Sequence, residues 1–114
     1  MPADCLFCRM ASGDVPVPKV HQDDLVFAIR DINPQAPTHA LVIPVEHIGS
    51  AADLGDGHGA LLGRLFAVAA RIAAEDGLDG GWRLVTNVGP DAGQSVPHLH
   101  VHLLGGRAMR WPPG

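Results

Sequence analysis

The chain has 114 residues, of which 46% are hydrophobic and 18% charged, and its formal net charge is −4 with neutral histidines. This length suits one compact domain with enough apolar residues for a core. The charged fraction argues against a disordered chain. The weakly acidic balance argues against a nucleic-acid binder, which presents a basic patch. No apolar run reaches the ~18 residues that span a bilayer, so no membrane association is expected.

The two cysteines lie together in one Cys5-Leu6-Phe7-Cys8 unit, whereas a disulfide framework spreads its cysteines along the chain. The first ten residues also lack the basic and apolar segments of a secretory signal. We therefore expect a cytoplasmic protein. Its two cysteines are either half of a metal site or small buried side chains.

The first half of the chain reads as short elements. A helix is predicted over residues 5–11, because Gly13 suits a C-terminal helix cap. The β-branched segments that follow are separated by turn residues and a proline-rich loop, and they predict three strands: residues 20–21, 25–30 and 40–44.

The second half holds the longest predicted element. Apolar residues recur at helical spacing from Leu61 to Ala73, which predicts an amphipathic helix that ends at Gly77. Two further strands are predicted at residues 82–87 and 98–104.

Together these elements predict one α+β domain over residues 1–114. We expect a mostly antiparallel sheet of about five strands, covered by helices on one side. A sheet of this size is compatible with association into a dimer.

The last predicted strand carries His98, His100 and His102 at alternate positions. Alternate side chains share one face of a strand, so the three imidazoles line one face. They would stand about 7 Å apart, too far for all three to bind one ion through bonds of about 2 Å. Such a row suits an elongated anionic substrate, because a neutral nucleophilic ring can lie beside a ring that donates protons. The alternative is a solvated polar face of an edge strand.

The loop before this strand, residues 89–96, is rich in glycine and ends near Ser95. Backbone N–H groups of such loops can contact a phosphate, and the Ser95 hydroxyl adds a donor. Alone, the loop would indicate only a turn. Directly ahead of three in-phase histidines, it predicts a phosphate site.

The run from His98 to Leu104 matches the motif HφHφHφφ, where φ is apolar, and resembles the histidine-triad (HIT) family. The resemblance covers nearly the whole chain. Residues 31–39 are similar to the family's ribose-contacting segment, and residues 93–96 and 105–114 are similar to its Hint branch. The resemblance implies a HIT-like fold with one long helix and a short N-terminal helix, assembled as a homodimer.

The resemblance also implies the catalytic residues. The middle histidine of the triad attacks the α-phosphorus of a nucleotide in this family, which makes His100 the implied nucleophile. A covalent nucleotidyl-histidine would form and then be hydrolysed by water. His102 and Ser95 would contact the phosphate and the leaving group, His39 would help to orient the triad, and His98 would support His100.

A binding site for a purine nucleotide, AMP or an AMP-amine, is implied in the same way. Asp31 would accept hydrogen bonds from the ribose hydroxyls, and Asn87 would lie near the phosphate and ribose. Apolar side chains would contact the base and the loop would contact the phosphate; the implied residues are Leu6, Phe7, Met10, Ile29, Ile32, Gly93, Gln94, Ser95, Val96, His100 and His102. Without the resemblance, the apolar ones would read as ordinary core.

Cys5 and Cys8 could form half of a metal site, which needs two further ligands. The resemblance to some bacterial members implies His47 and His98 as further ligands. Two thiolates and two imidazoles make a closed tetrahedral zinc site, which is structural rather than catalytic. The alternative is that the cysteines are buried apolar side chains and that His47 is a surface or capping residue.

The Hint branch cleaves phosphorus–nitrogen bonds of adenosine phosphoramidates, so the resemblance implies such a hydrolase without an organic cofactor. One alternative is a dinucleoside polyphosphate hydrolase or nucleotidyl transferase of the same family, against which the Trp-Pro-Pro-Gly tail argues. The other is a non-catalytic, zinc-stabilised nucleotide-binding module, against which the intact His100 and Ser95 argue.

Overall fold

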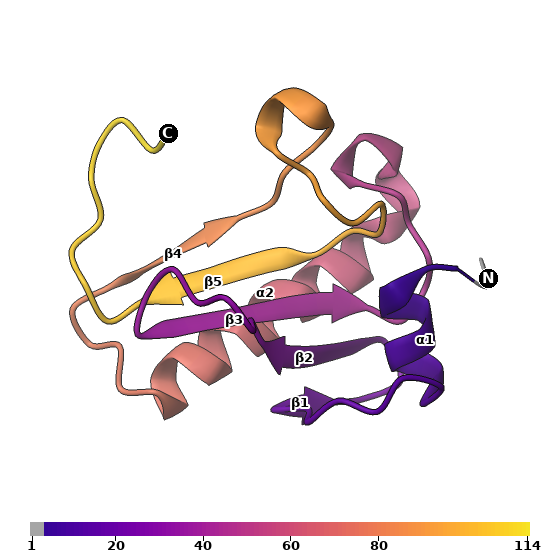
Figure 1. The fold of residues 1–114 in the computed structure, drawn as a ribbon, viewed down its shortest axis with the longest axis horizontal. Coiled ribbons are helices and arrows are strands. Elements are labelled where there is room, and N and C mark those ends of the chain that lie inside the picture. Colours follow the sequence, from indigo (N-terminus) through magenta and orange to yellow (C-terminus); the bar gives the residue numbers. More distant parts are fainter. Residues whose placement is uncertain (1–3) are drawn as a thin grey trace.

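The computed structural model describes residues 4–114, so the first three residues of the expected domain lie outside it. One antiparallel sheet forms its centre, with strands in the order β1-β2-β3-β5-β4 (Figure 1). The strands are β1 (His21–Gln22), β2 (Val26–Arg30), β3 (Thr38–Pro44), β4 (Trp82–Val85) and β5 (Val101–Gly105). This sheet, with one long and one short helix, confirms the predicted fold class.

The two α-helices, α1 (Leu6–Ser12) and α2 (Gly59–Glu75), pack on opposite faces of the sheet. The α2 face is built from β2 and β3 residues Val26, Ala28, Ala40 and Val42. The α1 face uses the alternate residues Phe27, Ile29, Leu41 and Ile43. The prediction of helices on one side only is therefore wrong, because both faces of these strands are apolar and each needs a cover.

The short helix α1 begins and ends as its sequence predicts. Cys5 is the N-cap, and its Sγ accepts a hydrogen bond from the Cys8 N–H at 3.4 Å. Gly13 ends the helix with a φ of +91°, a conformation that glycine adopts without steric cost, and its N–H donates to the Met10 carbonyl. Both sulfurs are consequently held at the amino-terminal end of α1.

Short 3-10 helices occupy the loops around α2 and ahead of β5: η1 (Ala51–Asp53), η2 (Asp56–His58) and η3 (Pro90–Ala92). The last of these lies in the glycine-rich loop that precedes the histidines. Within the described part of the chain, no helix has the length and apolar character needed to cross a membrane.

Candidate functional site

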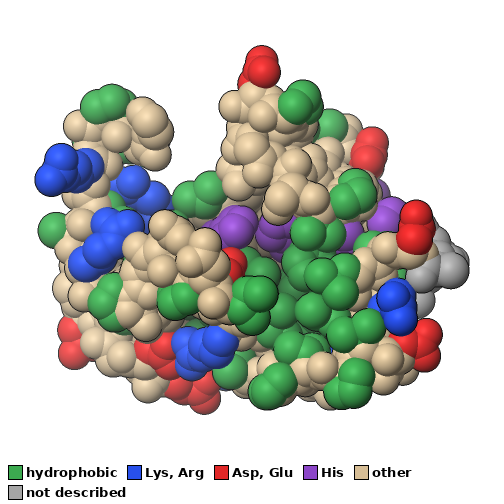
Figure 2. Space-filling model, in the orientation of Figure 1, with side chains coloured by type: hydrophobic (Ala, Val, Ile, Leu, Met, Phe, Trp, Pro, Cys, Tyr) green, Lys and Arg blue, Asp and Glu red, His purple; other side chains and the backbone are tan. Residues whose placement is uncertain are grey.

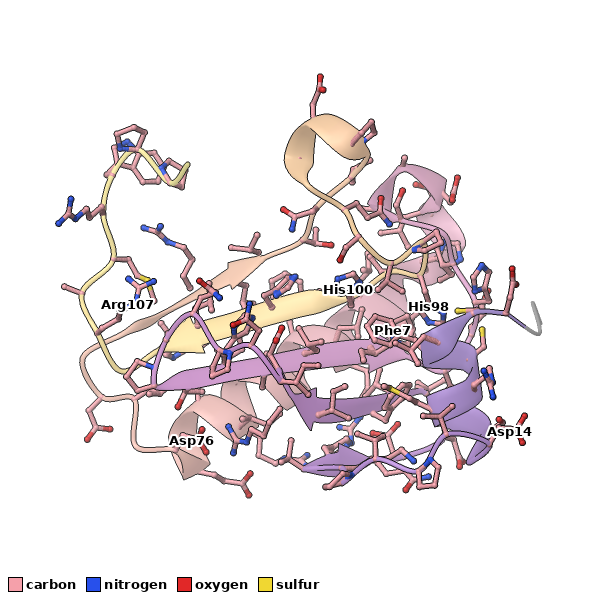
Figure 3. All side chains as sticks on the ribbon, in the orientation of Figure 1. Phe7, Asp14, Asp76, His98, His100 and Arg107 are labelled. Atoms are coloured by element: carbon pink, nitrogen blue, oxygen red, sulfur yellow. The ribbon has the colours of Figure 1, made fainter. Side chains whose placement is uncertain are left out.

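The three triad histidines lie on the α1 face of the sheet, and Figure 3 shows His98 and His100 beside Phe7. The predicted strand is shorter than expected, because β5 begins only at Val101. Before that point, the Leu99 N–H donates to the Ile48 carbonyl, beyond the end of β3. The alternation still holds through this segment, since Leu99 packs in the core beneath the sheet while the imidazoles face α1.

Four potential metal ligands converge at one end of the row: Cys5 and Cys8 from α1, His47 from the segment after β3, and His98. Cys5 Sγ lies 3.3 Å from His98 Nδ1, and Cys8 Sγ lies 3.3 Å from His47 Nδ1. The two Nδ1 atoms are 3.2 Å apart. Ligand atoms of a tetrahedral zinc site, with bonds of about 2.0–2.3 Å, lie roughly 3.3–3.8 Å apart. The four atoms are therefore spaced to surround one such ion.

The protonation of this cluster also fits a metal. His98 Nε2 lies 2.8 Å from the Pro44 carbonyl, so Nε2 carries the ring proton and Nδ1 faces His47 as a bare lone pair. Burial lowers the pKa of the His98 imidazole. Burial, followed by the neighbouring Cys5, raises the pKa of the Cys8 thiol to about 11. Facing lone pairs and buried thiols are stabilised by a cation between them, and this donor set is the one that zinc prefers.

His100 is held with one ring nitrogen free. Its Nδ1–H donates to the His98 carbonyl at 2.7 Å, and because a carbonyl only accepts, Nε2 carries the lone pair. Phe7 packs edge-on against the ring with centroids 5.1 Å apart. Thr86 Oγ1 donates to the His100 carbonyl at 2.8 Å. The tautomer and the orientation expected of a nucleophile are thus both fixed.

A second cluster, Asp31, His39 and His102, lies at the other end of the row. The Gln35 N–H donates to His39 Nδ1 at 3.0 Å, which places the His39 proton on Nε2. That Nε2–H lies 2.9 Å from His102 Nδ1 and 3.4 Å from Asp31 Oδ2. Burial, then the charges of His100 and His39, lower the pKa of His102 to about 4. His102 is therefore a neutral ring whose Nε2–H can donate.

The second cluster suits a proton relay better than a metal. An ion on His39 Nε2 would require the ring proton to move to Nδ1. The Gln35 N–H already donates to that nitrogen, so the move would leave two donors facing each other.

A cavity of about 290 Å³ runs from α1 to the histidines. Its apolar wall consists of Leu6, Phe7, Met10, Ile29, Ile32, Leu41 and Val96, and its polar wall of Arg30, Asp31, Ser95, His100 and His102. Figure 2 shows the same division, with a row of histidine side chains bordered by a broad apolar area. Such a cavity accommodates a ligand with a flat apolar end and a polar, anionic end.

Most of the implied binding residues line this cavity, but three do not: Asn87, Gly93 and Gln94. The Gln94 side chain instead braces the loop, because it accepts from the Gly89 N–H and donates to the carbonyls of Gly49 and Val96. Asn87 follows β4 by two residues, near the strand that carries the triad.

The loop over residues 31–37 is anchored at both ends by Asp76, at the end of α2 (Figure 3). Arg30 donates to its carboxylate at 2.6 and 2.9 Å, and Thr38 Oγ1 donates at 2.9 Å. The hydrogen bond from Arg30 outweighs burial and, with that from Thr38, keeps the pKa of Asp76 below its ordinary value. Arg30 directly precedes Asp31, and Thr38 directly precedes His39. Asp76 therefore helps to fix the positions of Asp31 and His39.

The sequence did not reveal Asp76, nor the backbone groups of Gln35 and Pro44 that set the tautomers. A backbone N–H or carbonyl has no residue-type signature. Asp76 could have been found only as one of several acidic residues near the end of the predicted helix.

A histidine row on a five-stranded antiparallel sheet, beside a glycine-rich loop and a half-apolar cavity, defines a small protein of the histidine-triad class. The family model described as HIT domain matches residues 12–109. The chain belongs to the HIT family, as the triad motif predicts.

Several relatives are similar over most or all of their length. The chain is 47% identical over 114 residues to an uncharacterized HIT-like protein of Synechococcus elongatus, and both chains are covered completely. It is 48% identical over 111 residues to the 14 kDa zinc-binding protein of Zea mays, with 96% of this chain and 87% of that protein covered. A solved HIT family hydrolase from Legionella pneumophila Philadelphia 1 has a TM-score of 0.95 at 48% identity, covering 97% of this chain and 100% of that chain.

Proposed function

We propose that this protein is a nucleoside phosphoramidase, which hydrolyses the phosphorus–nitrogen bond of purine nucleoside phosphoramidates (AMP-amines) through a covalent nucleotidyl-histidine on His100. One observation carries the proposal. The His100 Nδ1–H is held by the His98 carbonyl, which leaves Nε2 as a lone pair on a ring that lines a cavity of about 290 Å³.

The cavity walls assign the parts of the substrate. The base would pack between the α1 side chains, such as Phe7, and two isoleucines: Ile29 on β2 and Ile32 in the loop after it. Asp31 would accept hydrogen bonds from the ribose hydroxyls, since one of its oxygens is oriented by the Asn33 N–H at 2.8 Å. This arrangement brings the α-phosphate to the histidines.

His100 Nε2 would then attack the α-phosphorus, and the bond to the amine nitrogen would break. Donors at Ser95 and His102 stabilise the developing charge and assist protonation of the departing amine. Water next attacks the nucleotidyl-histidine, which releases AMP and restores His100. The net reaction consumes one water and yields an amine and AMP.

We further propose that Cys5, Cys8, His47 and His98 hold a structural zinc ion. Bound zinc supplies a cross-link that fixes α1 and the segment after β3 to the triad. The ligand spacing supports this assignment, as does the similarity to a relative named as a zinc-binding protein.

The proposed protein is a cytoplasmic homodimer of one HIT domain per chain, residues 1–114. The sheet supports the dimer in one respect. β4 is an edge strand, and Trp82 on it is 42% exposed, as is Phe66 on α2 at 56%. An edge strand with exposed apolar side chains favours association.

The test is turnover of an adenosine phosphoramidate by metal-quantified wild type, His100→Ala and His100→Gly. We expect both variants to lose about 10³-fold or more in rate while still binding AMP. His58→Ala, which removes a histidine that does not line the cavity, should keep the wild-type rate. Near-wild-type rates in the His100 variants would refute the nucleophile. An inert wild type that binds AMP would favour a nucleotide-binding module, and faster cleavage of a diadenosine polyphosphate would favour the other hydrolase class.

A further inference from the structure

The two residues between the cysteines form part of the wall of the cavity beside the triad. Leu6 and Phe7 belong to the apolar end of this cavity of about 290 Å³. Phe7 also packs edge-on against His100, with ring centroids 5.1 Å apart (Figure 3). Cys5 and Cys8 lie directly on either side of these two residues. A change in the distance between the cysteines therefore moves the wall against which the base would pack.

A separate cavity, of about 320 Å³, gives access to one of the two cysteines. Its wall includes Cys5 but not Cys8. It adjoins the cavity beside the triad, because Leu6, Ser95 and Val96 belong to both walls. Cys5 is only 5% exposed, so this cavity is the route by which a small solute reaches its sulfur.

The two sulfurs are also close enough to react with each other. Both cysteines are free, and Cys5 Sγ and Cys8 Sγ lie within 4.8 Å of one another in the ligand cluster. The Cys8 N–H donates to Cys5 Sγ at 3.4 Å, which orients the first sulfur over the first turn of α1. Cys-x-x-Cys pairs with this spacing form disulfides. When they bind a metal ion, both cysteines are thiolates, the form that peroxides oxidise.

We propose that Cys5 and Cys8 are a peroxide-sensitive pair, whose oxidation to a disulfide empties the metal site and weakens nucleotide binding. This inference rests on the proposed zinc site and the proposed nucleotide cavity. Ligand atoms around one tetrahedral ion lie roughly 3.3–3.8 Å apart, whereas the sulfurs of a disulfide are bonded at about 2 Å. The pair cannot satisfy both arrangements, so a disulfide leaves only His47 and His98 to hold the ion.

The oxidant is hydrogen peroxide. The Cys5 thiolate attacks one peroxide oxygen, the O–O bond breaks, and a sulfenic acid and a hydroxide form. The Cys8 thiolate then attacks the Cys5 sulfur, the S–O bond breaks, and a second hydroxide leaves as the disulfide forms. The two thiolates lose two electrons in total, and the peroxide takes up two protons from solvent to become two waters. A thiol reductant reverses the change.

The test treats zinc-quantified wild type with hydrogen peroxide and follows zinc release, thiol oxidation and AMP affinity together. We expect one zinc ion to be released for each disulfide, which is detected as the loss of two hydrogens from the tryptic peptide of residues 1–9. AMP binding should weaken about tenfold, as for the loss of one well-packed apolar contact. Dithiothreitol with added zinc should restore the zinc content and the affinity, which excludes methionine sulfoxide as the cause.

The matched variant is Cys5→His. It removes the sulfur that lines the cavity of about 320 Å³ and keeps four side chains that can bind zinc, so it should retain zinc at a peroxide dose that empties wild type. The sulfoxide of Met109 marks the dose in both proteins. Wild-type thiols that survive a dose at which Met109 is oxidised would overturn the inference, as would a disulfide that leaves AMP affinity unchanged. Equal zinc loss from Cys5→His and wild type would overturn the role of Cys5.

The outcomes separate this inference from the proposed function. A wild type that holds no zinc would refute the metal assignment, while disulfide formation and AMP affinity would still decide whether the pair acts on the cavity. Absence of phosphoramidate turnover would refute the hydrolase alone, because none of these measurements depends on turnover.

Discussion

The two ends of the histidine row contain similar side chains but are built for different chemistry. Each end brings two imidazoles within metal-binding distance of further ligands, which are two cysteine thiols at one end and the Asp31 carboxylate at the other. At the cysteine end, the Pro44 carbonyl accepts a hydrogen bond from the His98 Nε2–H and leaves Nδ1 as a lone pair that faces the other ligands. At the other end, the Gln35 N–H donates to His39 Nδ1. The ring proton of His39 is therefore on Nε2, between the imidazoles of His39 and His102. A single backbone group, a carbonyl at one end and an N–H at the other, thus determines whether the cluster suits a metal ion or a proton relay.

The largest effect is expected from breaking the metal end with Cys8→Ser. Zinc binding about a thousandfold weaker would lower the free energy of unfolding by about 4 kcal/mol when metal is in excess. Zinc quantification and urea unfolding, with and without a chelator, measure this change. Ser12→Ala on the same helix is the control. If chelation leaves the wild-type transition in place, the metal assignment is wrong.

At the relay end, His39→Ala should lower kcat by about 10- to 100-fold, because His102 Nδ1 loses its donor and His102 loses its fixed tautomer. His39→Gln keeps an N–H donor and should recover most of the rate. Zinc content should be the same in both variants. An unchanged kcat for His39→Ala would show that this hydrogen bond does not orient the triad.

The pKa of His102 predicts how stability changes with pH. It falls from an ordinary 6.5 to about 4 in the folded chain. Between these pH values the unfolded chain binds a proton at His102 that the folded chain does not. The contribution of His102 to the free energy of unfolding is therefore complete above about pH 6.5 and is lost as the pH falls toward about 4. Urea midpoints of wild type and His102→Asn across this window test the sign. The decline should be shallower in the variant, and parallel curves would contradict the assignment.

The smallest effect is expected at Asp76→Asn, which loosens the anchor of the loop that carries Asp31. Arg30 is 47% exposed, so the loss of stability should be only about 0.5–1 kcal/mol. AMP affinity should fall a few-fold at unchanged zinc content. Asp79→Asn, three residues further along, is the control, and equal AMP affinity in both variants would remove Asp76 from the positioning of this loop.

The sequence predicts well which residues share the face that carries the histidines, because side-chain alternation persists where strand pairing does not. His98 and His100 precede β5, yet they share one face as predicted, since Leu99 remains in the core on the other face. The four proposed metal ligands come from three separate segments, so their convergence followed from the family resemblance and not from their spacing.

The protonation states of the triad were beyond the reach of the sequence. They depend on which backbone group of Gln35, Pro44 or His98 faces each ring, and every residue carries the same groups. The position of α1 on the second face was missed for a related reason. Its buried side chains are few, Phe7 and Cys8, which is too short a pattern to show which face it covers.

The carbonyl of His98 has a consequence for redesign of this site. It keeps the proton of His100 in place, and any amino acid at position 98 would provide the same group. The reactive ring therefore depends on the path of the chain rather than on the identity of its neighbour. The proposed metal site could be rebuilt with apolar side chains that preserve this path, and the tautomer of His100, two residues away, should remain as it is.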